Sequence, residues 1–485
     1  MNLLLITCIF FVCTIINANP ACAQSYIEKD IKFFGAKGNG KTNDHKSFQK
    51  AATYFNSRGG NGKLIISPGT YIVGKQIFTA GKADQHAYKG EDVLHFVNIK
   101  NFKIQGSSKS ILKYADSFRF GAFDPATGKP LEHGNNLFAI HTYAAFVGTC
   151  VYLENCNNVS VIDLTLDGNN KNLILGGFYG DVGRQLPHYG IFIKNSSNIL
   201  VKKLNVHHFG LDGICVSNVL SKQKDNITLL NSRFEYNARQ GLSWVGGNSL
   251  LVNACKFNHT GKINFFSPPS AGVDIEAEVG PIRNGVFENC EFVDNTGAGM
   301  LADSGDSRDC IFKNCTFWGT TNWSIWVTKP GFTFTGCNIY GSFVHGYDSP
   351  DKKNATSFLS CTFEDKLYNG KEPYGSFLIE SNNRKRVSFT DCTFIANKKK
   401  LCWIDIDPAI KPDEKYQFNN CVFVVKSASY PAGDFVGLIK GMTIKNCTFS
   451  FKHPDAEKKQ YYLIGYPEKY YVDLGGNKIV YSTAK

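Results

Sequence analysis

The sequence predicts an all-β chain, a parallel β-helix of roughly ten or more coils with a short capping helix near its N-terminus. A phrase made of a small residue, Cys, any residue, and Phe or Ile recurs eight times in the second half of the chain. Its successive cysteines are 35, 25, 22, 24, 31, 29 and 26 residues apart. Such a period indicates stacked repeats. The cysteines of the phrase are Cys255, Cys290, Cys315, Cys337, Cys361, Cys392, Cys421 and Cys447.

Apolar residues alternate with polar ones inside each repeat, which is typical of short strands joined by turns. In the repeat that ends at Phe449, Ile444, Cys447 and Phe449 are predicted to point inward, and Asn446 to turn the chain. Parallel coils lie about 4.8 Å apart, so each Cys stacks on the next Cys. We therefore expect most of these cysteines to be free, buried thiols, because a free Cys behaves as a small hydrophobe.

A second column of small residues fixes the facing of another strand in each coil. Seven residues after Val206, Phe234, Phe292, Phe317, Ile339 and Phe363 stand Gly213, Gly241, Gly299, Ser324, Gly346 and Gly370. The Phe257 coil reaches Gly272 after 15 residues, which predicts an insertion of eight. Because strand side chains alternate between the two faces, residues two and four places after this column are expected to face outward.

The N-terminal part of the mature chain predicts a cap. Phe48, Ala51, Ala52 and Phe55 give the spacing of an amphipathic helix, and Asn43 or Asp44 can cap its start. The glycine-rich run 59–62 ends it, and 63–66 open the first strand. We expect one solenoid domain over 24–485, with a cap at 24–62, coils at 63–450 and a C-terminal cap at 451–485. Irregular insertions at 114–148 and 171–187 are expected to line a binding face.

Residues 1–23 are predicted to be a cleaved secretory signal, with an apolar run from Leu3 to Ile16 and a small residue at Ala21 and Ala23. The protein is then secreted or periplasmic, and a lipid anchor at Cys22 is not favoured. No later stretch is long and apolar enough for membrane insertion. The net charge of +12 suits a solvated basic surface or an acidic polymer; no nucleic-acid motif accompanies it. The oligomeric state stays open.

The segment 33–44, together with the helix and 67–71, resembles the pectate-lyase-like superfamily of right-handed parallel β-helices. That resemblance implies a right-handed solenoid and a polysaccharide substrate, since the superfamily contains polygalacturonase-type glycosidases and polysaccharide lyases. The segments 210–214 and 239–243 lie in strands comparable to those of the polygalacturonase motifs. The paired Asp, the His-Gly and the Arg-Ile-Lys motifs of polygalacturonases are absent, so galacturonan hydrolysis by that apparatus is not expected.

The predicted register selects the candidate catalytic carboxylates. Val273 and Ile275 face the core, so Asp274 and Glu276 face outward together, about 6.6–7 Å apart along the strand. Asp303 is predicted to stack on Glu276, and Asp212 precedes the small-residue column in an earlier coil. Glycosidic bond cleavage needs an acid and a second carboxylate, and neighbouring carboxylates raise the pKa of one of them.

Six further residues are predicted to bind substrate near these carboxylates. Arg239 precedes Gly241, and His207 and His208 precede Asp212. Trp326 occupies an outward position, and His188 and Tyr189 stand at the end of the second insertion. Exposed aromatic rings stack on sugar faces. Trp244 falls in the inward register and is predicted to belong to the core.

These features predict a secreted carbohydrate-active enzyme, first a glycoside hydrolase acting on a complex polysaccharide, with an acidic substrate left open. The first alternative is a polysaccharide lyase that eliminates across a uronate, with Arg239, or a histidine with Tyr189, as base. That alternative allows a Ca²⁺ ion on Asp274, Glu276 and Asp303; the hydrolase prediction needs no metal or other cofactor. The second alternative is a non-catalytic glycan-binding β-helix.

Overall fold

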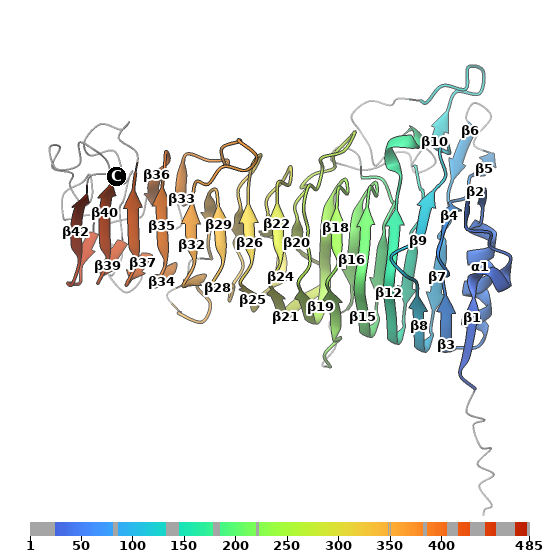
Figure 1. Cartoon of the computed structure of the whole chain (residues 1–485), viewed down its shortest axis with the longest axis horizontal. Coiled ribbons are helices and arrows are strands. Elements are labelled where there is room, and N and C mark those ends of the chain that lie inside the picture. Colours follow the sequence, from blue (N-terminus) through green and yellow to red (C-terminus); the bar gives the residue numbers. More distant parts are fainter. Residues whose placement is uncertain are drawn as a thin grey trace, which may run out of the picture.

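The computed structural model of the chain describes residues 25–80, 86–131, 145–177, 185–219, 223–347, 349, 351–381, 386–404, 416–426, 442–452 and 471–482. The predicted signal segment lies outside these residues, as do parts of both predicted insertions. Strands stack along one long axis, and helix α1 (His45–Ser57) covers the N-terminal end (Figure 1). Among the described residues, no helix is long and apolar enough to cross a membrane.

Three parallel sheets wrap the solenoid, with one strand of each in a typical coil. Sheet 1 runs in spatial order through β1 (Ile27–Asp30), β3 (Gly60–Ile65), β8 (Lys100–Gln105), β12 (Asn157–Asp167), β15 (Ser197–His207), β17 (Ile227–Leu230), β19 (Gln240–Asn253), β21 (Ala277–Glu288), β25 (Cys310–Lys313), β28 (Thr333–Thr335), β31 (Ser357–Leu359), β34 (Ser388–Thr390), β37 (Tyr416–Asn419), β39 (Met442–Lys445) and β41 (Tyr471–Asp473). The short strand β24 (Gly305–Ser307) also pairs with β21.

Sheet 2 shares the long strands β12 and β15 with sheet 1. It runs through β2 (Asn39–Asn43), β4 (Gly69–Val73), β9 (Ser110–Tyr114), β12, β15, β18 (Arg233–Glu235), β22 (Glu291–Val293), β26 (Thr316–Trp318), β29 (Asn338–Tyr340), β32 (Thr362–Glu364), β35 (Thr393–Ala396), β38 (Val422–Val425), β40 (Thr448–Lys452) and β42 (Lys478–Ser482). Two isolated bridges at Lys256, one to Arg233 of β18 and one to Glu291 of β22, join these strands.

Sheet 3 carries the predicted catalytic strand. It runs through β7 (Leu94–Val97), β11 (Val151–Glu154), β14 (Ile191–Lys194), β16 (Asp212–Ser217), the first half of β19, β20 (Val273–Ile275), β23 (Met300–Ala302), β27 (Ile325–Val327), β30 (Phe343–His345), β33 (Phe377–Ser381) and β36 (Lys400–Ile404). These parallel pairings confirm the predicted fold class.

The recurring phrase marks the corner between sheets 1 and 2. Its small residue adopts a left-handed backbone in all eight repeats, with φ between 53° and 63°. Asn, Gly and other small residues tolerate that conformation best. The eight cysteines that follow are free and buried, as predicted, and their thiols contact main-chain carbonyls; Cys315 Sγ, for example, lies 3.5 Å from Phe287 O in the previous coil. The Phe rings stack at 4.6–5.5 Å.

The predicted small-residue column is confirmed from Gly213 to Ser324 and wrong beyond it. Ser324 N donates to Ser342 O, and Ile325 pairs with Phe343, so Ser342 takes the place predicted for Gly346. Gly370 lies in a turn, because Tyr368 bridges to Lys371. The constant spacing of seven residues between the inward Phe or Ile and the small-residue column fails in these two coils. One residue, Gly341, separates β29 from Ser342, whereas a long loop separates β32 from β33.

The ends of the solenoid also differ in detail from the predictions. Helix α1 begins as predicted, but Asp44 makes no cap hydrogen bond with its side chain, which binds Lys37 N and Gly38 N; Asn43 Oδ1 accepts from His45 N instead. The first strand after α1 begins at Gly60 rather than at residue 63. Strand pairing continues beyond residue 450, because β41 and β42 add to sheets 1 and 2.

Each of the two segments predicted to be irregular contributes one strand to a small separate sheet, which corrects that prediction. Its four strands are β5 (Ile77–Ala80), β6 (His86–Lys89), β10 (Arg119–Phe123) and β13 (Ile174–Gly176). Figure 1 shows β6 and β10 projecting beyond the coils near the N-terminal end. A short 3-10 turn, η3 (Asn170–Asn172), precedes β13, and another, η1 (Ile31–Phe34), follows β1.

Candidate functional site

Parallel pairing in sheet 3 sets the facing of the candidate catalytic strand. Leu242, Ser243 and Trp244 pair with Val273, Asp274 and Ile275, and Asp274 pairs with Leu301 on the next coil. Val273 and Ile275 are fully buried in the core, and Trp244, also predicted to be core, is 1% exposed. Asp274 therefore lies on the outer side of the sheet, as predicted. It is nevertheless only 3% exposed.

The two oxygens of Asp274 have different surroundings. Gln240 Nε2 donates to Asp274 Oδ2 over 2.7 Å, whereas Oδ1 has no hydrogen-bond partner among the described residues. Burial raises the pKa of Asp274 well above its usual range, and the negative charge of Glu276 adds to the rise, with Arg239 opposing it. Asp274 is thus a buried carboxyl group that favours its protonated form and has one oxygen free.

Glu276 lies half-buried two residues further along. Burial raises the pKa of Glu276. The negative charges of Glu278 and Asp303 add to this rise, and a hydrogen bond with Ser304 opposes it. Asp303 is exposed. The structure thus brings Asp274, Glu276 and Asp303 within electrostatic range of one another, as the register predicted. Such a group combines a carboxyl group of raised pKa with neighbouring carboxylates, and glycosidic bond cleavage uses an acid and a second carboxylate.

Asp212 and the partly buried Arg239 form an ion pair beside this group. Asp212, the first residue of β16, has no exposed surface. Arg239 Nε donates to its Oδ1 over 2.9 Å and Nη2 to its Oδ2 over 2.7 Å. Burial by itself would lower the pKa of Arg239, but Asp212 holds that pKa well above its usual range. Asp212 is therefore an anchor for Arg239, and Arg239 is a fixed positive charge beside Asp274.

Tyr189 joins this group, and Trp326 extends the same face. The Tyr189 ring stacks on Phe192 at 5.1 Å, and burial raises the pKa of its hydroxyl, with Arg239 opposing the rise. Trp326 pairs with Leu301 in the column that contains Asp274, two coils further on, or about 9.6 Å. Its ring lies 5.0 Å from Trp323, which in turn lies 5.6 Å from the exposed Tyr374.

His188 does not join the group. Its side chain is fully buried, its ring packs 4.5 Å from Tyr114 and 4.8 Å from Phe209, and its Nδ1 accepts from Gly210 N. Burial lowers the pKa of His188 to about 3. The prediction that it reaches substrate is not supported, because the end of the insertion turns the imidazole into the core.

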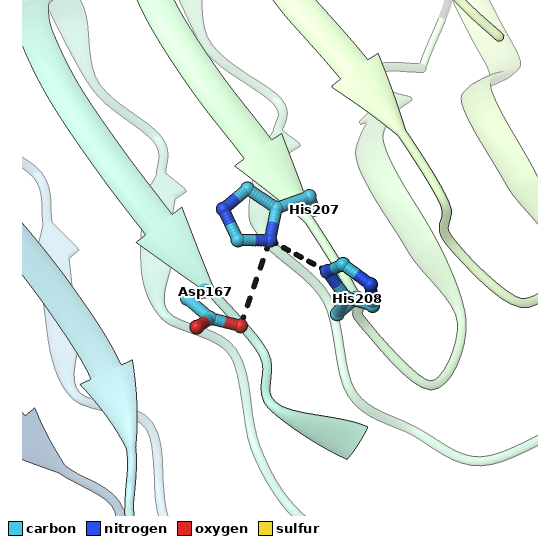
Figure 2. A group of neighbouring side chains, drawn as sticks. All are labelled: Asp167, His207 and His208. Atoms are coloured by element: carbon cyan, nitrogen blue, oxygen red, sulfur yellow. Dashed lines mark hydrogen bonds and ion pairs between the residues drawn. The ribbon is translucent and has the colours of Figure 1, made fainter. Parts of the chain in front are cut away.

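His207 and His208 form a separate cluster with Asp167 at the ends of β12 and β15 (Figure 2). His207 Nδ1 lies 2.7 Å from His208 Nδ1 and 3.6 Å from Asp167 Oδ1. The His208 ring stacks on Tyr236 at 5.6 Å. Burial lowers the pKa of both imidazoles, while Asp167 opposes the change. The structure therefore places these histidines in sheets 1 and 2, outside the carboxylate group of sheet 3.

Two residues of the site were missed by reasoning from the sequence. Gln240 holds Asp274 Oδ2 with its amide nitrogen and accepts Ala271 N with its amide oxygen. Its position, just before Gly241 and in register with Asp212, was a signal that could have identified it. Glu278 adds negative charge near Glu276 and Tyr189, and it continues the alternation of Asp274 and Glu276.

Comparisons with known proteins bear on the fold. The family described as "Right handed beta helix region" matches residues 149–331, which include the carboxylate group. No curated protein matches the chain. Among solved structures, the Azotobacter vinelandii mannuronan C-5 epimerase AlgE4 A-module is 13% identical, with 95% of this chain and all of that chain covered and a TM-score of 0.39.

Two more structural neighbours show similarly low identity. The catalytic unit of the GH87 α-1,3-glucanase of Streptomyces thermodiastaticus is 11% identical over 94% of this chain and 69% of that chain, with a TM-score of 0.33. An N-terminal fragment of the bacteriophage Phi29 gene product 12 is 13% identical over 94% and 72%, with a TM-score of 0.45. All three TM-scores lie below 0.5, so these neighbours carry no argument about this chain. The strand register, together with the family match over residues 149–331, confirms the predicted parallel β-helix fold.

Proposed function

We propose that this chain is an exported glycoside hydrolase that cleaves a polysaccharide across the outer face of β16–β23. The observation that carries the proposal is Asp274: it is buried, its pKa is raised, and its Oδ1 is free beside a second carboxylate. A carboxyl group that stays protonated near neutral pH can donate its proton to the leaving oxygen of a glycosidic bond. Asp274 is assigned this role, which requires that substrate binding expose its buried Oδ1.

Glu276 is assigned the second carboxylate role, as base or nucleophile. It lies closer to solvent than Asp274, so water and substrate can reach it. Asp303 contributes negative charge that stabilises positive charge on the sugar ring in the transition state. Arg239 uses Nε and Nη2 to bind Asp212, which leaves its Nη1 edge for a hydroxyl or carboxylate of the substrate. The rings of Trp323 and Trp326 supply a surface for sugar stacking.

Elimination by a lyase is the second candidate, and the protonation of its bases counts against it. A lyase needs a group that accepts the proton beside the uronate carboxylate. The pKa of Arg239 and that of Tyr189 are both raised, so each keeps its proton near neutral pH. His207 and His208 contact Asp167 and Tyr236 instead of the carboxylate group. A calcium-assisted lyase on Asp274, Glu276 and Asp303 stays a prediction.

The two reactions differ in their products. The mature protein is incubated with neutral and uronate glycans, with and without Ca²⁺, while reducing ends and the ultraviolet absorbance of unsaturated uronate are followed. Hydrolysis predicts reducing ends without absorbance; both signals together indicate elimination. Glycan binding without either signal indicates a binding module and contradicts the enzyme assignment for that panel.

The site assignment is tested with matched carboxylate variants. Asp274→Asn and Glu276→Gln should each lower kcat by about 10²–10⁴-fold, the range that positioned acid–base groups contribute. The control is Glu288→Gln. Glu288 is the last residue of β21, and its carboxylate forms an ion pair with Lys313 at 3.1 Å. This variant should retain turnover. Full turnover by Asp274→Asn would refute the role given to Asp274.

A further inference from the structure

We propose that Asp167, His207 and His208 bind one divalent first-row transition metal ion, such as Zn²⁺, at a site separate from the carboxylate group. The three side chains come from two adjacent coils and point toward one another (Figure 2). One ligand atom of each lies within 4.8 Å of the other two. Imidazole nitrogen and carboxylate oxygen are ligands that such ions accept.

The fold brings the three ligands together by register and by a turn. Asp167 and His207 are the last residues of β12 and β15, and they pair directly across these strands. His208 adopts a left-handed backbone, with φ of 58°, which is uncommon for a residue other than Gly. This turn reverses the direction of the His208 side chain, so that its Nδ1 faces Nδ1 of His207 rather than the opposite side of the strand.

Two imidazole nitrogens that face each other need something between them. At 2.7 Å, the pair can share one proton, or the two lone pairs can bind one cation. Zn–N distances of about 2.0–2.1 Å at a tetrahedral angle place two nitrogens about 3.3 Å apart. The pair must therefore open by about 0.6 Å, which small rotations of two half-buried rings provide. Asp167 Oδ1, at 3.6 Å from His207 Nδ1, is then near the third vertex.

Neighbouring groups orient these ligands. Asn169 N donates to Asp167 Oδ1 over 2.9 Å, and the Tyr236 ring supports His208 by stacking. Glu235, in register with His207 on the next coil, is already held by Arg233 Nε at 2.8 Å and Asn258 Nδ2 at 3.1 Å. It is therefore an outer-sphere group. Three protein ligands leave a coordination position open, as in metal sites that bind water or a ligand oxygen.

The test is metal binding to the chelator-treated mature protein, measured with Zn²⁺ by calorimetry and with Co²⁺ by its visible absorption. We expect one ion per chain and a rise in melting midpoint on Zn²⁺ addition, because an ion that binds only the folded chain stabilises it. His207→Gln and His208→Gln should each weaken Zn²⁺ binding by about 100-fold or more, since losing a supporting group alone costs about 10–100-fold.

The control is His95→Gln. His95 also lies beside two carboxylates, but its Nδ1 faces Asp92 at 3.7 Å and its Nε2 faces Glu154 at 3.1 Å, so the two do not converge. The His95→Gln and Asp274→Asn variants should each bind Zn²⁺ like the unmodified protein. If a histidine variant does not fold, Asp167→Asn replaces it. Binding far below one ion per chain, or an equal loss in His95→Gln, would overturn the site and indicate a shared proton between the imidazoles.

Discussion

At the scale of single residues, two buried carboxylates of sheet 3 are treated differently by their neighbours. Asp212 receives two hydrogen bonds from Arg239, whereas Asp274 receives one, from Gln240. A buried polar atom without a partner costs stability, so an arrangement that leaves Asp274 Oδ1 free is unfavourable for folding. Such atoms gather at functional sites, which is why Asp274 rather than Asp212 is assigned the acid role.

Asp274→Asn should stabilise the fold while it removes activity. The pKa of Asp274 is raised in the folded chain, so its contribution to stability is complete below the pKa of the unfolded chain and is lost as the pH rises through the folded value. An amide does not ionise. The variant should therefore gain about 1 kcal/mol at neutral pH, a rise of about 1–2 °C in melting midpoint, and gain little at acidic pH.

Melting curves of both proteins between acidic and alkaline pH measure this difference. Equal midpoints at every pH would show that ionisation of the Asp274 carboxyl does not destabilise the fold. A higher midpoint of Asp274→Asn at acidic pH alone would contradict the predicted pH dependence. Asp303→Asn is the control: Asp303 is exposed, so its substitution should change the midpoint little.

The residues of the site divide into those that the sequence could predict and those that it could not. The outward facing of Asp274 and Glu276 follows from alternation alone. The burial of Asp274, the hydrogen bond from Gln240 and the inward turn of His188 depend on side-chain packing between distant coils. Alternation states which side of a sheet a residue occupies, but it does not state what covers that side.

At the scale of elements, the glycines of the small-residue column show how closely neighbouring coils approach in sheet 3. A Cβ on Gly241 would lie 2.6 Å from Gly272 O and 3.0 Å from Phe257 Cβ. Gly213, Gly272 and Gly299 face the carbonyl of the next coil in the same way, at 2.6–2.9 Å. Backbone carbonyls cannot move aside without breaking the ladder that positions Asp212 and Asp274.

Gly241→Ala should therefore destabilise the protein by about 1–3 kcal/mol, the usual cost of inserting an atom into a packed interior. Chemical denaturation measures the loss. Ser324→Ala is the matched control in the same column: Ser324 already carries a Cβ, and its hydroxyl donates to Tyr340 O over 2.8 Å. Loss of that hydrogen bond should cost about 1 kcal/mol. If Gly241→Ala were as stable as the unmodified protein, the coils would not be in close contact there.

The same column shows where prediction from a repeat fails. Counting seven residues from each Phe placed Gly213, Gly241 and Ser324 correctly, because the connecting turns there have equal lengths. The count failed at Gly346 and Gly370, because turns in a solenoid vary in length without disturbing the strands that they join. Only the hydrogen-bonded pairing of Ile325 with Phe343 reveals the change.

At the scale of the whole molecule, the stacked corners give each of the eight coils from Cys255 to Cys447 the same three features: a left-handed small residue, a buried thiol and an inward Phe or Ile. In a solenoid each repeat contacts its neighbours alone, so a side chain that fills a corner in one coil is suited to the same corner in the next. Val or Ala would differ from Cys in volume. A thiol also contacts main-chain carbonyls, as Cys447 Sγ does at 3.4 Å from Phe418 O.

The thiols of the folded protein should accordingly resist modification. Every cysteine whose side chain the structure describes is free and buried, so a reagent in solvent cannot reach the thiols of the folded chain. At Cys255, burial also raises the pKa of the thiol to about 12, so little reactive thiolate forms there at neutral pH. Treatment with a maleimide, followed by mass spectrometry, should label few cysteines in native buffer and nearly all in denaturant. A reductant should leave both the labelling and the melting midpoint unchanged. If reduction increased the labelling in denaturant, the protein would contain disulfides. Rapid labelling of the eight cysteines of the recurring phrase in native buffer would mean that the corners between sheets 1 and 2 open to solvent.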